Sequence, residues 1–91
     1  MLHIIKSVAA LKEAIALYAE DDEVLLIEDA VYVVNPKHSL FHLLQGLSTY
    51  ALQSDIEARG IQRYTSPSVS IINYQGFVEL TVKQANSLTW N

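Results

Sequence analysis

The chain has 91 residues, enough for one domain, and a domain of this size buries only about 60 to 65% of the surface that its unfolded chain exposes. Its formal net charge is −4 and its six basic residues are scattered, so we expect no direct binding of nucleic acid. No cysteine is present, which excludes disulfides, thiolate metal sites and cysteine nucleophiles.

The apolar content is high for so small a chain. Hydrophobic residues make up 51% of the sequence and charged residues 18%, so we expect more apolar surface than one small core can hide. Association with another chain is the predicted solution. The opening MLHIIKSVAALKE shows neither a signal peptide nor a membrane span, and a cytosolic location without membrane contact is therefore expected.

The first elements predicted are a strand, a helix and a second strand. Leu2–Ile5 is a short apolar run, and Ser7 can cap a helix that follows it. Val24–Ile27 is continuously apolar, which is typical of a strand covered on both faces in a parallel sheet. The helical face between these strands is formed by Val8, Leu11, Ile15 and Tyr18.

The middle of the chain carries helix start and stop signals. Asn35 before Pro36 predicts a helix over residues 36–45, with Gly46 just past its end. A strand is predicted at Ser48–Leu52 from its composition.

A capping box follows that strand. Ser54 and Glu57 open a predicted helix that ends at Gly60, and Val69–Ile72 is predicted to be extended.

The last helix is predicted over residues 74–85, and Ser87–Trp90 reads as a short edge strand. Helical winding predicts a docking face with Leu80 at its edge, formed by Tyr74, Phe77, Val78, Thr81, Val82 and Ala85. Strands and helices thus alternate throughout. This pattern predicts a single α/β domain over residues 1–91, with three layers, a mostly parallel sheet of about five short strands, and helices on both faces.

Two pairs of residues are candidates for chemistry. His38 and His42 would share one face of the predicted helix, within reach of one metal ion, although half-buried or interface histidines are the favoured interpretation. Glu28 and Asp29 follow the second strand, where ligands of α/β sheets bind. The favoured interpretation is that Asp29 caps a helical turn over residues 30–34. A small ligand-binding or hydrolytic domain using either pair stays as an alternative hypothesis.

Two other polar features are predicted to be structural. His3 reads as a hydrogen-bonded histidine on an edge strand, and the acidic run over residues 20–23 reads as a solvated turn. The sequence has no GxGxxG, P-loop or GxSxG motif, and we expect neither a stand-alone enzyme nor a bound metal or cofactor.

Three stretches carry a family resemblance: LLIEDAVYVV at 25–34, YALQSDIEARGI at 50–61, and NYQGFVELTVKQANSLTW at 73–90. Together they resemble the TusB/DsrH family, and the match runs from Leu2 to Trp90. The third stretch is the most specific. The resemblance implies a DsrE-like fold and a non-catalytic subunit of a sulfur-relay complex required for 2-thiolation of the tRNA wobble uridine.

The partners implied by the resemblance are TusC-like and TusD-like subunits, joined with this chain in a heterohexamer that is a dimer of trimers. A TusE-like protein would receive the sulfur from the complex. A DsrH-like role in sulfur oxidation is the alternative within the family. DsrH members of sulfur oxidisers typically carry a cysteine in the first helix, and residues 7–19 here contain none.

The interface candidates are residues on the last helix and strand, with one histidine from the middle of the chain. They are Trp90, Phe77, Val78, Val82 and His42. For Phe77, Val78 and Val82, a place in the domain core is an equal alternative. An isolated chain could form a homo-oligomer in place of its missing partners.

Overall fold

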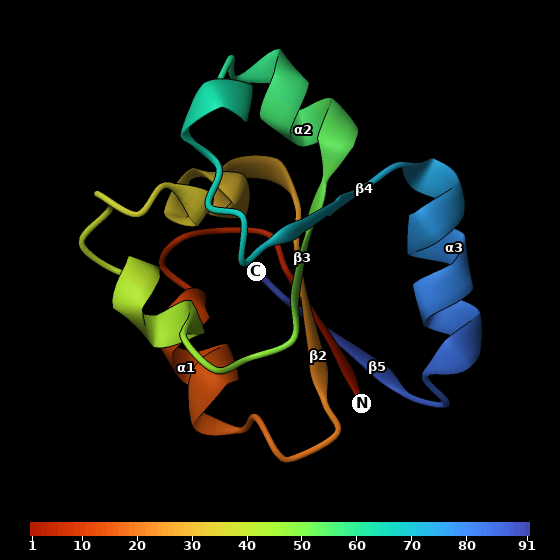
Figure 1. The fold of residues 1–91 in the computed structure, drawn as a ribbon. Coiled ribbons are helices and arrows are strands. Elements are labelled where there is room, and N and C mark those ends of the chain that lie inside the picture. Colours follow the sequence, from red (N-terminus) through yellow and green to blue (C-terminus); the bar gives the residue numbers. More distant parts are fainter.

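Five short strands form one sheet in the order β4-β3-β2-β1-β5, and every neighbouring pair is parallel. The computed structural model describes residues 1–91 (Figure 1). The strands are β1 (Leu2–Ile5), β2 (Glu23–Leu26), β3 (Thr49–Leu52), β4 (Ser70–Ile72) and β5 (Ser87–Trp90). The predicted α/β class and strand number are confirmed, and the sheet is parallel throughout.

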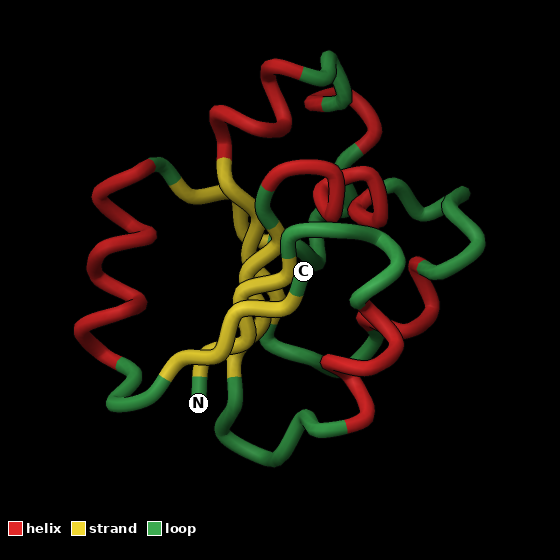
Figure 2. Tube along the Cα trace, turned by 180° about the vertical axis from the view of Figure 1, so that it is seen from behind, coloured by secondary structure: helices red, strands yellow, loops and turns green.

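The helices lie on both faces of the sheet, as predicted, but unequally. They are α1 (Leu11–Ala16), η1 (Glu28–Val34), η2 (Phe41–Leu44), α2 (Gln53–Ala58), η3 (Gln62–Tyr64) and α3 (Tyr74–Lys83), where η marks a 3-10 helix. Figure 2 shows α3 alone on one face, with the other helices gathered on the opposite face. This arrangement agrees with the DsrE-like fold. None of the helices has the length and apolar character needed to cross a membrane.

The core is divided by the sheet into two clusters. The larger cluster holds 13 buried residues, among them Val24 and Leu26 of β2, and it packs under α1, η1 and α2. The smaller cluster joins Leu25 to Leu80 of α3. Because β2 is the central strand and contributes to both clusters, its apolar residues do not alternate with polar ones.

The predicted helix over residues 36–45 is wrong in extent. The side-chain oxygen of Asn35 accepts a hydrogen bond from the backbone N–H of Lys37 at 2.9 Å, which closes a local turn. Only η2 follows, at Phe41–Leu44. Gly46 does adopt the predicted left-handed conformation, with φ of +81°.

Two predicted helix starts are also wrong. The Ser7 hydroxyl accepts from the backbone N–H of Ala10 at 3.2 Å and so closes a turn, while α1 begins only at Leu11. At α2, Ser54 lies inside the helix, which starts at Gln53 without a side-chain cap. The bond of Ser7 therefore shapes the turn before α1 rather than the first residue of the helix, and α2 follows directly on β3.

The docking face of α3 differs from the prediction. Leu80 is the buried residue of this helix, at 6% exposure, and Phe77 packs beside it. Relative to the prediction, α3 is rotated about its axis so that Leu80 faces the sheet, and Gly76 explains this rotation. A Cβ added at Gly76 would lie 2.9 Å from the Cβ of Ile72, so the bare glycine lets α3 approach β4 closely. The side chains of Tyr74, Val78 and Val82 consequently point outward.

Candidate functional site

The outward side of α3 carries an apolar stripe. Tyr74, Val78 and Val82 follow one another at four-residue spacing, and they are 74%, 42% and 79% exposed. We call these three residues the α3 stripe. Phe77 lies beside it, with its ring edge-on to Tyr74 at 6.2 Å between centroids. A row of apolar side chains on the only helix of this face is typical of a protein interaction surface.

A polar network around Glu23 fixes α3 in this orientation. The buried Glu23 carboxylate accepts hydrogen bonds from the Tyr50 hydroxyl at 2.8 Å, from Nζ of Lys83 at 3.2 Å and from Nε2 of Gln84 at 2.7 Å. These bonds tie the end of α3 to β2 and β3. The network therefore holds the α3 stripe on the outer side of the helix.

The network also shifts two pKa values. Desolvation raises the pKa of Glu23, but hydrogen bonds from Gln84, Tyr50 and Lys83 together outweigh it and leave the pKa below its ordinary value. The same carboxylate raises the pKa of Tyr50. Glu23 is thus held as an anion in a buried place.

Trp90 and His3 form a second polar contact. The indole N–H of Trp90 donates to Nδ1 of His3 at 3.2 Å, and Trp90 packs half-buried against the larger core cluster. Since an indole nitrogen only donates, Nδ1 of His3 accepts, and its Nε2 carries the proton that is donated to Asp22 at 2.9 Å. Trp90 therefore ties β5 to β1, and its role in a subunit contact stays a prediction.

The expected places of His3 and of the acidic run are corrected. His3 is 1% exposed because β1 lies between β2 and β5 and is not an edge strand. Asp22 accepts hydrogen bonds from His3 and from the backbone N–H of Ala19, which hold its pKa far below the ordinary value. Asp22 and Glu23 are therefore bonded into the fold, and only the first half of the run is an exposed turn.

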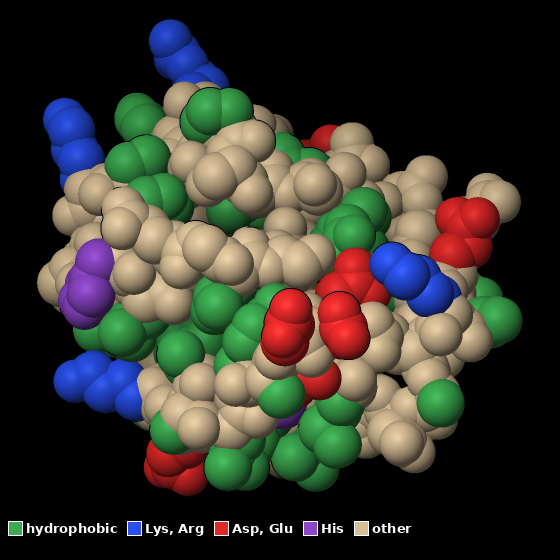
Figure 3. Space-filling view, turned by 60° about the horizontal axis from the view of Figure 1, so that its bottom comes forward, with side chains coloured by type: hydrophobic (Ala, Val, Ile, Leu, Met, Phe, Trp, Pro, Cys, Tyr) green, Lys and Arg blue, Asp and Glu red, His purple; other side chains and the backbone are tan.

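The acidic run dominates one end of the molecule. Figure 3 shows carboxylates gathered on the end from which the strands start, with a basic side chain beside them. A shallow cavity of about 530 Å³ opens there, and its lining includes Glu20, Asp21 and Lys83. Asp22 and Glu23 also line this cavity, and both are already bonded to other side chains of the protein, so we assign no ligand to it.

Acid should weaken the fold through Asp22 and Glu23. A carboxyl whose pKa is lower in the folded state stabilises the fold above its unfolded pKa, and that contribution is lost as the pH falls. With ordinary values of 3.8 for Asp and 4.5 for Glu, we expect a melting temperature that is flat near neutrality and falls from pH 4.5 downward.

Circular dichroism melts across this pH range check that expectation. Asp22→Asn should melt lower than the wild type at neutral pH and show a shallower acid dependence, because one of the two shifted groups is gone. A variant whose acid dependence matched that of the wild type would contradict the assignment of Asp22.

Glu28 and Asp29 are held in ion pairs at the carboxyl ends of the strands. Arg59 donates to one oxygen of Asp29 from Nε at 3.0 Å and from Nη2 at 2.9 Å, which raises the pKa of Arg59. Lys6 lies 3.5 Å from Glu28. The predicted turn exists as η1, but its cap is Ile27 without a side-chain bond, so the capping role of Asp29 is wrong. The ion pair of Asp29 with Arg59 joins η1 to α2. Because Glu28 is paired with Lys6 as well, the two acids do not form a pair of free carboxylates.

The two candidate histidines do not share a helical face. His38 lies in a turn, where its Nδ1 accepts from the backbone N–H of Leu40 at 3.1 Å, and His42 lies in η2. No group of three or more potential metal ligands occurs in the structure. His42 is exposed, and a contact with a partner stays a prediction for it.

Comparisons with known proteins agree with this fold. A family model described as DsrH like protein matches residues 6–87. "Protein TusB" of Serratia proteamaculans is 38% identical over 76 residues, which cover 81% of this chain and 80% of the relative. "Protein TusB" of Salmonella dublin and that of Salmonella arizonae are each 40% identical with the same coverage. The chain belongs to the TusB/DsrH family.

Proposed function

We propose that the chain is a non-catalytic subunit of a cytosolic sulfur-relay complex that serves 2-thiolation of the tRNA wobble uridine. Family membership with relatives named TusB is the observation that carries the proposal. The absence of cysteine gives the subunit its accessory character, because sulfur relay proceeds by attack of a thiolate on a persulfide sulfur. The reactive thiol belongs to a partner.

The proposed partners are TusC-like and TusD-like subunits in a dimer of trimers, with a TusE-like protein as the next acceptor. A subunit that meets two different partners does so through two different surfaces. The α3 stripe supplies one such surface, with Phe77 beside it. The opposite side of the sheet, where Trp90 and His42 lie, supplies the other.

Two observations favour this function over its rivals. Residues 7–19 lack the cysteine of sulfur-oxidising DsrH members, and α1 lies within them. For a hydrolase, Asp29 would have to be free, yet Arg59 holds it through two hydrogen bonds.

Deleting the gene in its own organism tests the proposal. We expect tRNA hydrolysates to lose 2-thiouridine derivatives in mass spectrometry, and a plasmid copy to restore them. A strain with unchanged 2-thiouridine and slowed sulfur oxidation would instead support the DsrH-like alternative. If neither changed, the chain would have no part in either relay.

A further inference from the structure

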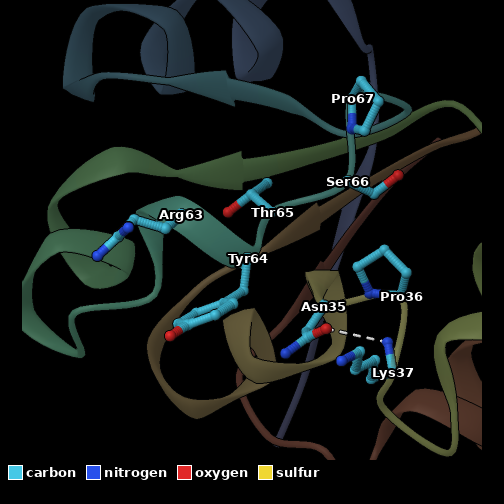
Figure 4. Close-up of a pocket in the computed structure, with 8 residues that line it drawn as sticks. All are labelled: Asn35, Pro36, Lys37, Arg63, Tyr64, Thr65, Ser66 and Pro67. Carbon is cyan, nitrogen blue, oxygen red and sulfur yellow. Dashed lines mark hydrogen bonds between the residues drawn. The ribbon is translucent and has the colours of Figure 1, made fainter.

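A pocket of about 330 Å³ lies between the turn after η1 and the loop that leads from η3 to β4. Its walls come from residues 35–37 and 63–67 (Figure 4). The lining contains two cations, Lys37 and Arg63, and no carboxylate. In a chain with a net charge of −4, this is a local excess of positive charge.

The two cations are free to bind a ligand. Lys6, Arg59 and Lys83 are held by carboxylates, whereas Lys37 and Arg63 form no ion pair. Asn35 adds a third donor: its side-chain oxygen accepts from the backbone N–H of Lys37, which leaves its NH2 group available. Side-chain donors that have no acceptor within the protein match the oxygens of an anion such as phosphate.

An exposed aromatic ring stands beside these donors. Tyr64 is 56% exposed, and in the view of Figure 4 its ring lies between the side chain of Arg63 and those of Asn35 and Lys37. An accessible ring next to cations is the combination that stacks a nucleobase while its phosphate is neutralised. Arg63 is exposed and unpaired, so its side chain can turn toward the anion by rotamer changes.

The walls of the pocket are held in place before any ligand arrives. The backbone N–H of Ser66 donates to the carbonyl of Val34 at 3.0 Å, which joins the two walls directly. The hydroxyls of Ser66 and Ser68 bond at 2.8 Å, and Thr65 donates to the carbonyl of Ile61 at 3.2 Å. Little backbone freedom is therefore lost when a ligand binds, and the main ordering cost falls on the exposed side chains of Lys37, Arg63 and Tyr64.

We propose that this pocket binds a nucleotide, with the phosphate on Lys37, Arg63 and Asn35 and the base stacked on Tyr64. The nucleotide is either a free mononucleotide or a unit of an RNA chain, since both present the same phosphate and base. The second case would overturn the expectation, drawn from the net charge, that the chain does not bind nucleic acid directly. The site is local, and it does not depend on the assembly proposed above.

Titration of the full 91-residue chain by NMR tests the pocket, with inorganic phosphate, uridine 5′-phosphate and an unmodified tRNA transcript as separate probes at low ionic strength. We expect backbone shifts at residues 35–37 and 63–67. The double variant Lys37→Gln with Arg63→Gln should weaken every binding probe about tenfold. Lys12→Gln removes another unpaired, exposed cation outside the pocket, and it should change affinity less than twofold, which is about the noise of such a comparison.

Tyr64→Leu tests the contact with the base separately from the contact with the phosphate. It should weaken the mononucleotide about fivefold and leave inorganic phosphate unchanged, because only the base uses the ring. Dependence on Lys37, Arg63 and Tyr64 with the mononucleotide supports a free nucleotide, and the same dependence seen only with tRNA supports an RNA unit. No shifts with any probe, or shifts insensitive to all three residues, would overturn the proposal, while the thiolation test stands apart from either result.

Discussion

Replacing Val78 and Val82 together by aspartate is expected to abolish co-purification of the chain with its partner subunits. Both side chains are exposed in the isolated domain, so neither change opens a cavity in the core. In the complex, each aspartate would have to be desolvated against an apolar surface. If each change costs about 2 kcal/mol of association free energy, the double variant binds about a thousandfold more weakly.

Gln62→Asp is the matched control for that variant. Gln62 is exposed on η3, on the other face of the sheet from α3, so the control introduces the same side chain away from the α3 stripe. We expect this control to co-purify normally and all variants to melt near the wild-type temperature. Normal assembly of the double aspartate variant would remove the α3 stripe from the proposed interface.

Leu80→Ala should destabilise the fold itself by about 2 to 4 kcal/mol, because it leaves a cavity between α3 and the sheet. A domain of this size is stable by about 5 to 14 kcal/mol, so the loss is a large fraction of the total. Val82→Ala, on the opposite side of the same helix, should change stability by less than about 0.5 kcal/mol.

Urea unfolding of both alanine variants measures the difference. The sequence alone predicted that Val82 docks and that Leu80 lies at the edge of the docking face, so the two variants test the observed rotation of α3. Equal losses at both positions would contradict that rotation.

The strands were predictable because their signal is local. Leu2–Ile5 is apolar except at His3, and the continuous apolar run Val24–Ile27 overlaps the observed strand Glu23–Leu26; such runs are typical of strands that are buried on both faces of a parallel sheet. Gly46 and Gly60 were equally readable, since both adopt the left-handed conformation that glycine favours after a helix.

The helix faces and starts were less predictable because other segments decide them. On α3, two apolar sides compete, and the close approach of Gly76 to Ile72 together with the bonds of Glu23 to Lys83 selects the side with Leu80. Helical periodicity cannot weigh contacts with distant segments.

The two polar sites, Glu23 and the pocket of Lys37 and Arg63, also differ in how far the sequence alone could predict them. The buried role of Glu23 had a sequence signal, because Glu23 lies two residues before Leu25 and so shares with it the α3 side of the sheet. The pocket of Lys37 and Arg63 had none: its two walls are far apart in the sequence, and the bond from Ser66 to Val34 brings them together.

Native mass spectrometry of the chain co-expressed with the TusC-like and TusD-like subunits of its own organism tests whether the chain is a subunit of the proposed complex. We expect one assembly with the mass of a dimer of trimers that contains this chain. A chain that remains separate from both subunits at micromolar concentration would contradict it.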